Sequence, residues 1–229
     1  MSARLPVLYC DNHLLVVQKP AGLPAVPDET RDESLFDRAK EYVRLEFDKK
    51  GDVFLGIVHR LDRPVSGVMV FARTSKAASR LSEQFRSRVA KKVYWGVGLG
   101  LQRANSGAVS QWLEKDEAAN RVRVLASGMR HAKQAVTRWK VLERAPGRIL
   151  YELEPETGRP HQLRVACASL GTPLAGDLKY GAPSALPDKS IGLHARALDI
   201  THPTRDERLH FEAPAPELAI WDFGATRAV

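Results

Sequence analysis

The hydrophobic and polar positions of the chain follow two periods, and each period predicts regular structure. Apolar residues recur at steps of three and four over residues 34–47 and 75–88, which is the spacing of one face of an α-helix. Both stretches begin near residues that commonly cap helices, namely Asp32, Glu33, Ser34, Thr74 and Ser75. A third helix is expected to begin with Pro160 at its first position and to stop at Gly171, and a short fourth helix is expected over residues 216–223.

Short apolar or alternating runs predict strands through the rest of the chain. These runs cover residues 13–18, 53–58, 67–72, 93–99, 108–113, 121–125, 135–142, 149–153, 193–201 and 208–212. Residues 182–190 are typical of an exposed loop. Many short strands in hairpin-like succession with few helices predict an α+β fold with a mixed, largely antiparallel sheet, in one domain over residues 1–229.

Charge and cysteine content narrow the class of protein. The 229 residues include 35 Lys and Arg against 27 Asp and Glu, a net charge of +8, which fits either a solvated basic surface or a polyanion-binding protein. Cys10 and Cys167 lack the spacing of a disulfide framework or a thiolate zinc site. No apolar run has the length of a signal sequence or a membrane span, so we expect a cytoplasmic protein.

One polar loop interrupts the apolar pattern between two expected strands. It reads HRLDRPVSG over residues 59–67 and holds a single carboxylate, Asp62, among two arginines and a histidine. Loops carried by rigid strands often present catalytic groups, and nearby cations favour the ionised carboxylate. From these residues alone, a structural cluster of salt bridges is the somewhat favoured interpretation.

The same loop closely resembles the HRLDRxTSG signature of the RluA family of pseudouridine synthases. Four further segments resemble family motifs in the family's order: residues 11–22 ending in KPAG, KVY at 92–94, ETGRPHQLR at 156–164, and LHA at 193–195 with HP at 202–203. Together the segments extend over nearly the whole chain. We expect a stand-alone catalytic domain without the S4-type RNA-binding domain that many relatives carry at the N-terminus.

The resemblance implies a pseudouridine synthase fold with a central catalytic cleft, and it implies the family reaction. In that reaction the N1 to C1′ bond of a uridine is broken, the uracil is turned, and C5 is joined to C1′, without a cofactor. Asp62 matches the essential aspartate, which either attacks C1′ or C6 or assists glycal formation. Tyr94 matches the active-site tyrosine, and Arg164 matches an arginine beside the aspartate; a core tyrosine and a helix-surface arginine are the structural alternatives.

The resemblance also implies an RNA partner, ribosomal RNA or transfer RNA or both, from which the target uridine is flipped. Arg60 matches an arginine that fills the vacated space, and a phosphate contact or a salt bridge is the alternative role. The other expected RNA contacts are His59, Arg63, His161, Gln162 and Lys92. His194, His202 and His210 have no supporting ligand pattern, so no metal is expected. We expect no membrane partner, and a monomer is the simplest expectation.

Three positions depart from the family pattern, and the residues present disfavour three other classes of protein. Val65 and Pro160 stand where threonine is usual, and residues 165–167 read VAC where a histidine often follows the valine. A noncatalytic RNA-binding protein on this scaffold is disfavoured as the sole role because the aspartate, tyrosine and arginine are present. A glycoside or nucleoside hydrolase is disfavoured because the loop offers one carboxylate, and a zinc deaminase because PCxxC is absent.

Overall fold

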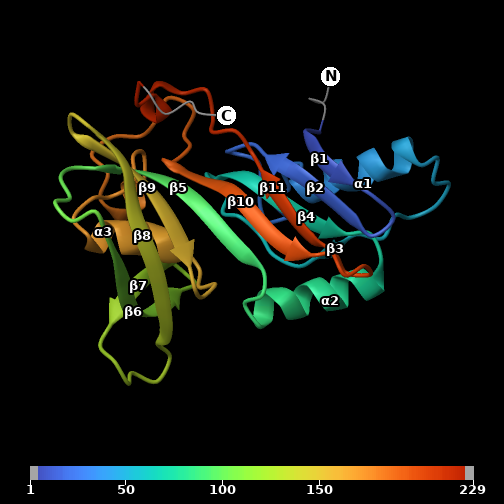
Figure 1. Cartoon of the computed structure of the whole chain (residues 1–229), viewed down its shortest axis with the longest axis horizontal. Coiled ribbons are helices and arrows are strands. Elements are labelled where there is room, and N and C mark those ends of the chain that lie inside the picture. Colours follow the sequence, from blue (N-terminus) through green and yellow to red (C-terminus); the bar gives the residue numbers. More distant parts are fainter. Residues whose placement is uncertain (1–4, 225–229) are drawn as a thin grey trace. The chain divides into compact units, whose positions relative to one another are not determined.

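A computed structural model describes residues 5–224 and divides the chain into two compact units (Figure 1). Unit 1 contains the chain up to Lys92 together with Ala195–Pro214, and unit 2 contains Val93–His194 and the residues after Pro214. The chain therefore passes between the units inside two strands and once more after Pro214. Residues 1–4 and 225–229 lie outside the described part.

Unit 1 is built on a sheet with the strand order β1-β2-β4-β10, in which β3 pairs with β4 and β11 with β10. The strands are β1 (Val7–Cys10), β2 (Leu14–Lys19), β3 (Gly56–Ile57), β4 (Ser66–Ala72), β10 (Leu193–Thr201) and β11 (Arg208–Glu212). Two helices of unit 1, α1 (Leu35–Glu46) and α2 (Ser75–Arg86), lie on opposite sides of these strands (Figure 1). This arrangement explains why β2 and β4 are almost continuously apolar.

Successive residues of β2 and β4 contribute alternately to two separate hydrophobic cores. Leu14 and Val70 belong to the core that contains Leu81 of α2, whereas Leu15 and Phe71 belong to the core that contains residues of α1. A strand turns alternate side chains to opposite faces, so a sheet covered on both faces needs apolar residues at every position.

The two helices of unit 1 begin where the sequence predicts. Ser34 caps α1 in a capping box with Asp37, and the hydroxyl of Thr74 accepts a hydrogen bond from the Ala77 amide at the start of α2. Each cap satisfies a backbone N–H that has no partner inside the helix.

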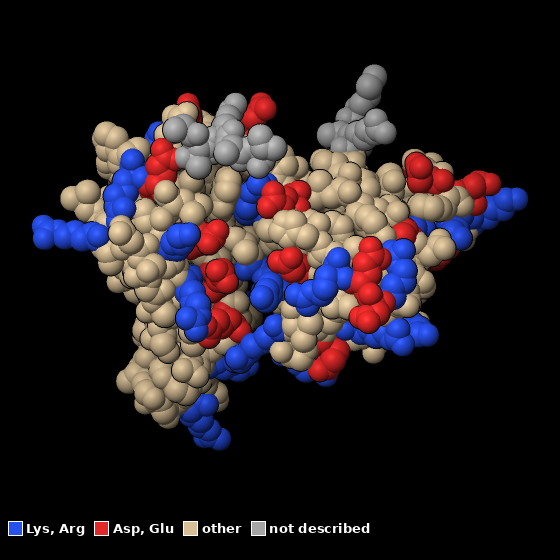
Figure 2. All heavy atoms as spheres, in the orientation of Figure 1, with Lys and Arg blue, Asp and Glu red and all other residues tan. Residues whose placement is uncertain are grey.

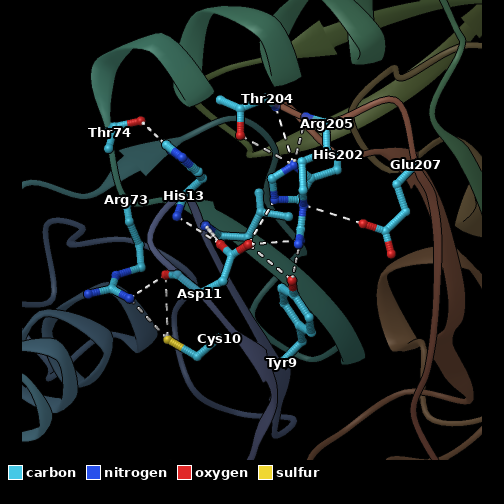
Figure 3. A network of polar contacts seen from close by, with 11 residues as sticks. Tyr9, Cys10, Asp11, His13, Arg73, Thr74, His202, Thr204, Arg205 and Glu207 are labelled. Carbon is cyan, nitrogen blue, oxygen red and sulfur yellow. Dashed lines mark hydrogen bonds and ion pairs between the residues drawn. The ribbon is translucent and has the colours of Figure 1, made fainter.

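A polar cluster in unit 1 joins the turn after β1 to the turn after β10 (Figure 3). The Asp11 carboxylate accepts hydrogen bonds from the amides of His13 and Leu14, both at 2.8 Å, and lies 2.8 Å from Nε2 of the buried His202. His202 Nδ1 accepts the Arg205 amide at 3.1 Å, so Nε2 is the nitrogen that donates to Asp11. Burial alone would raise the pKa of Asp11, but these hydrogen bonds lower it to about 2.

Unit 2 contains an antiparallel sheet with the strand order β5-β9-β8-β6-β7. Its strands are β5 (Lys91–Leu99), β6 (Ser106–Asp116), β7 (Arg121–Leu125), β8 (Lys133–Ala145) and β9 (Arg148–Pro155). Helix α3 (Gln162–Ser169) packs Val165 against a core formed with Leu113, Val122 and Ala135 of the sheet. Two short 3-10 helices follow, η1 (Leu178–Tyr180) and η2 (Ala219–Trp221).

The α+β class and the largely antiparallel pairing are confirmed, while three predicted elements are wrong in extent. The strand expected over residues 53–58 is reduced to Gly56–Ile57, and the C-terminal helix is only the 3-10 turn η2. Helix α3 begins at Gln162 and not at Pro160, because His161 takes a left-handed conformation with φ of 50° and the chain turns there. Residues 182–190 form a loop, as expected.

Candidate active site

The expected site residues fall into both units. Unit 1 carries His59, Arg60, Asp62, Arg63 and Lys92, and unit 2 carries Tyr94, His161, Gln162 and Arg164.

The loop that presents Asp62 is closed by its own backbone. It leaves β3 and enters β4, and the Val65 amide donates to the Asp62 carbonyl at 3.0 Å. Leu61 and Val65 on either side are buried, whereas the Asp62 side chain is partly exposed. The buried neighbours fix the backbone of the loop, while part of the Asp62 side chain stays at the surface.

His59 anchors the start of this loop inside unit 1. Its Nε2 accepts the Val70 amide at 3.0 Å, and its ring stacks on Phe85 of α2 with 4.7 Å between centroids. The imidazole thus takes a backbone N–H of β4 just beyond the short pairing with β3. Burial, together with the positive charge of Lys92, lowers the pKa of His59 to about 3, so the ring is neutral at pH 7. An RNA contact by His59 stays a prediction, and these contacts show the imidazole engaged within unit 1.

Lys19 anchors the end of the loop. Its side chain is fully buried, and Nζ donates to the carbonyls of Pro20 at 2.9 Å and Arg63 at 3.1 Å. The Gly22 amide also donates to the Arg63 carbonyl, at 2.9 Å. The KPAG turn is therefore tied to the Asp62 loop. Burial lowers the pKa of Lys19 to about 7, while the negative charge of Asp62 acts in the opposite direction.

The three cations of unit 1 that are expected to contact RNA differ in their surroundings. Arg63 turns away from the loop, donating from Nε to the Gly22 carbonyl at 3.0 Å and forming an ion pair with Asp32. Lys92 is partly buried, and burial lowers its pKa. Arg60 is exposed, and among residues 5–224 its side chain makes no hydrogen bond or ion pair, which suits a side chain that engages a ligand.

In unit 2, Arg164 is held by an acidic partner that the sequence analysis did not identify. The guanidinium and Asp177 form a buried bidentate ion pair, with Nε to Oδ2 at 2.7 Å and Nη2 to Oδ1 at 2.8 Å. The helix-surface alternative for Arg164 is therefore wrong. Tyr94 lies partly buried on β5, opposite Leu153 of β9.

His161 and Gln162 make hydrogen bonds within unit 2. The Gln162 amide group accepts from the Thr157 hydroxyl at 2.7 Å and donates to the Val136 carbonyl at 2.8 Å. His161 Nδ1 lies 2.7 Å from the hydroxyl oxygen of Tyr180. Gln162 thus links the segment before α3 to β8, and RNA contacts by these two residues stay predictions.

Three anchoring residues were not identified from the sequence, although each lies beside a local feature that marks it. Lys19 ends the apolar run LLVVQK, and Asp177 and Tyr180 lie between Gly176 and Gly181. Both glycines have positive φ, 78° and 105°, which marks a fixed turn. Such local features mark the residues, but they do not identify the groups with which the residues form hydrogen bonds or ion pairs.

The expected chemical groups are a carboxylate, cations and a phenol, and they are divided between the two units. Among residues 5–224, no cluster of three or more His, Cys, Asp or Glu is arranged to hold a metal ion. None of the helices in this range is long and apolar enough to cross a membrane.

Comparisons with known sequences point to one family. A family model described as RNA pseudouridylate synthase matches residues 13–169. The uncharacterized RNA pseudouridine synthase slr1629 of Synechocystis is 33% identical over 219 residues, covering 93% of this chain and 66% of the relative. The dual-specificity RNA pseudouridine synthase RluA of Haemophilus influenzae is 38% identical over 211 residues, covering 91% of this chain and 92% of the relative.

A solved structure shares the fold. Human RNA Pseudouridylate Synthase Domain Containing 4 superposes with a TM-score of 0.77 at 28% identity, covering 93% of this chain and 89% of that chain. The pseudouridine synthase fold expected from the sequence is confirmed. The chain therefore belongs to the RluA family of RNA pseudouridine synthases, which are isomerases.

Proposed function

We propose that this chain isomerises specific uridines of ribosomal RNA, transfer RNA or both, with Asp62 as the catalytic carboxylate and Tyr94 and Arg164 as further catalytic residues. The observation that carries the proposal is the anchoring of the Asp62 loop. His59 holds its start through the Val70 amide, and Lys19 holds its end through the Arg63 carbonyl. A catalytic group gains most when its backbone is fixed before the substrate binds.

The reaction needs no external oxidant or reductant. The N1 to C1′ bond breaks, a C5 to C1′ bond forms, C5 loses its proton to solvent and N1 gains one, so the product is an isomer of the substrate. In this proposal Asp62 stabilises or traps the electron-poor intermediate. Tyr94 supplies a ring for stacking and a hydroxyl for proton transfer at C5 or C2′.

The RNA backbone is bound by dispersed cations in this proposal. Figure 2 shows Lys and Arg side chains spread among Asp and Glu on the face it presents. Two exposed arginines of unit 2 are paired with carboxylates: Arg123 with Asp116 at 2.9 Å, and Arg138 with Glu156. Arg60 is exposed without such a pair and is the proposed contact at the flipped base. The printed name of the Haemophilus relative, a dual-specificity enzyme, supports keeping both RNA classes as candidates.

Pseudouridine mapping on total RNA tests the proposal. Cells that lack the protein are complemented with the wild type, with Asp62→Asn, or with Asp52→Asn, the same substitution at an exposed carboxylate of unit 1. We expect at least one pseudouridine to disappear on deletion and to return with the wild type and Asp52→Asn but not with Asp62→Asn.

Two outcomes would count against the proposal. Restoration of the modification by Asp62→Asn would remove Asp62 from the chemistry. If every pseudouridine persists in the deleted cells and purified protein modifies none of their RNA, a noncatalytic RNA-binding role takes precedence.

A further inference from the structure

The guanidinium of Arg164 is fixed from two directions by a short segment that follows α3. The Asp177 carboxylate accepts hydrogen bonds from Nε and Nη2 of Arg164 in one bidentate contact. The side chain of Arg164 is 7% exposed and that of Asp177 is 1% exposed. Because two parallel hydrogen bonds define the guanidinium plane, they also define the direction in which Nη1 points.

An aromatic ring supports the same group. The guanidinium carbon of Arg164 lies 5.0 Å from the ring centroid of Tyr180, within the range of a cation–π contact. The Tyr180 hydroxyl accepts the Val122 amide at 2.8 Å and lies 2.7 Å from His161 Nδ1. Since the amide can only donate, the hydroxyl proton is available to the imidazole. The ring is therefore held at its far end by β7 and by the residue that caps α3.

The backbone of this segment is itself constrained. The Asp177 carbonyl accepts the amides of Tyr180 and Ala182, both at 3.0 Å. Gly176 has φ of 78°, and a Cβ there would lie 2.6 Å from the Ser190 carbonyl oxygen. The backbone at Ser190, also in unit 2, is thus packed against the turn that contains Asp177.

We propose that Asp177 and Tyr180 are positioning residues that set the orientation of the Arg164 guanidinium for catalysis. A buried ion pair contributes little net stability, because desolvation of both charges offsets their attraction. The ion pair matters instead for geometry, because it restricts the guanidinium of a flexible side chain to one plane. This inference rests on the proposed catalytic role of Arg164.

The test compares single and double variants in one activity assay. The substrate is total RNA from cells lacking the protein, labelled with tritium at C5 of uridine, and each turnover releases that tritium to solvent. With enzyme in excess, the maximal rate and the half-saturating enzyme concentration are measured separately. The variants are Asp177→Asn, Tyr180→Phe, Arg164→Gln and the double variant Arg164→Gln with Asp177→Asn.

We expect Asp177→Asn to lower the maximal rate by about 10- to 100-fold while half-saturation changes little, because misorientation affects the reacting state more than RNA binding. Tyr180→Phe keeps the ring and loses its two hydroxyl contacts, so a smaller fall in the same direction is expected. Asp177→Asn should have no further effect on the rate once Arg164 is already Gln.

Controls separate positioning from loss of fold. All four tryptophans lie in unit 2, so their fluorescence gives the folded fraction of the unit that contains Asp177, and rates are normalised to it. Glu217→Gln makes the equivalent carboxylate-to-amide substitution at an exposed position of unit 2 and should behave as the wild type. If Asp177→Asn does not fold, Tyr180→Phe still tests the proposal.

The failures are distinguishable. If the wild type releases no tritium from this RNA, the proposed function fails. If the wild type is active and the normalised rates of Asp177→Asn and Tyr180→Phe equal it, the positioning role is overturned. If the effects of Asp177→Asn and Arg164→Gln multiply in the double variant, Asp177 acts independently of Arg164 and the inference is again wrong.

Discussion

Replacing His59 by phenylalanine should change how the stability of unit 1 depends on pH. Phenylalanine retains a ring to stack on Phe85 but offers no acceptor to the Val70 amide. At pH 7.5 the orphaned amide should destabilise the variant by about 1–3 kcal/mol.

The pH dependence follows from the two protonation states of the imidazole. The folded pKa of His59 is about 3 and the unfolded value 6.5, so His59 contributes stability that is present above pH 6.5 and is lost as pH falls towards 3. Between pH 7.5 and pH 5.0 this linkage removes about 2 kcal/mol from the wild type and nothing from His59→Phe. The two proteins should therefore approach equal stability at pH 5.0.

Urea unfolding followed by circular dichroism in the helix band is the appropriate assay. Helices α1 and α2 belong to unit 1, so the helix signal comes mainly from unit 1. All tryptophans belong to unit 2, so their fluorescence reports the unfolding of unit 2. His131→Phe, at an exposed loop position of unit 2, is the control for loss of a histidine. Equal losses of stability in the wild type and His59→Phe between the two pH values would refute the buried neutral imidazole.

Two further predictions concern the Asp62 loop and the strand that follows it. Because the pKa of Lys19 in the folded protein is lowered to about 7, its contribution to stability is lost as pH falls. Raising the pH from 7 to 9 should therefore stabilise the wild type by about 2 kcal/mol relative to Lys19→Met, as measured by urea unfolding. Gly67→Ala should prevent folding or cost more than about 3 kcal/mol, because φ is 122° and the new Cβ would lie 2.2 Å from the Ala195 carbonyl oxygen. Gly22→Ala, with φ of 82° and open space, should cost only about 1–2 kcal/mol in thermal unfolding, and equal costs would contradict the steric reason.

Local pattern was sufficient for most elements of the fold. The apolar spacing located α1 and α2, and the runs in β2 and β4 located the central strands of unit 1. It overestimated the strand before His59, because Val53 and Leu55 contribute to a core without pairing in the sheet. An apolar residue is needed in both situations, so periodicity cannot distinguish them.

The candidate site could be predicted only in part, because a local motif identifies a residue but not its partner in the folded chain. Resemblance to the family selected Asp62, Tyr94 and Arg164 from their local motifs. It did not give Arg164 its partner, because Asp177 is thirteen residues away across a turn that only the folded chain defines.

The sequence by itself determined the family, the α+β class and the identity of the chemical groups, since motifs and hydrophobic periods are properties of neighbouring residues. The tertiary structure alone decided which groups meet: His59 with the Val70 amide, Arg164 with Asp177, and Asp11 with His202, which are 191 residues apart. Hydrogen bonds depend on distances of about 3 Å and on direction, and both are set by where the folded backbone carries each side chain rather than by its neighbours in the chain.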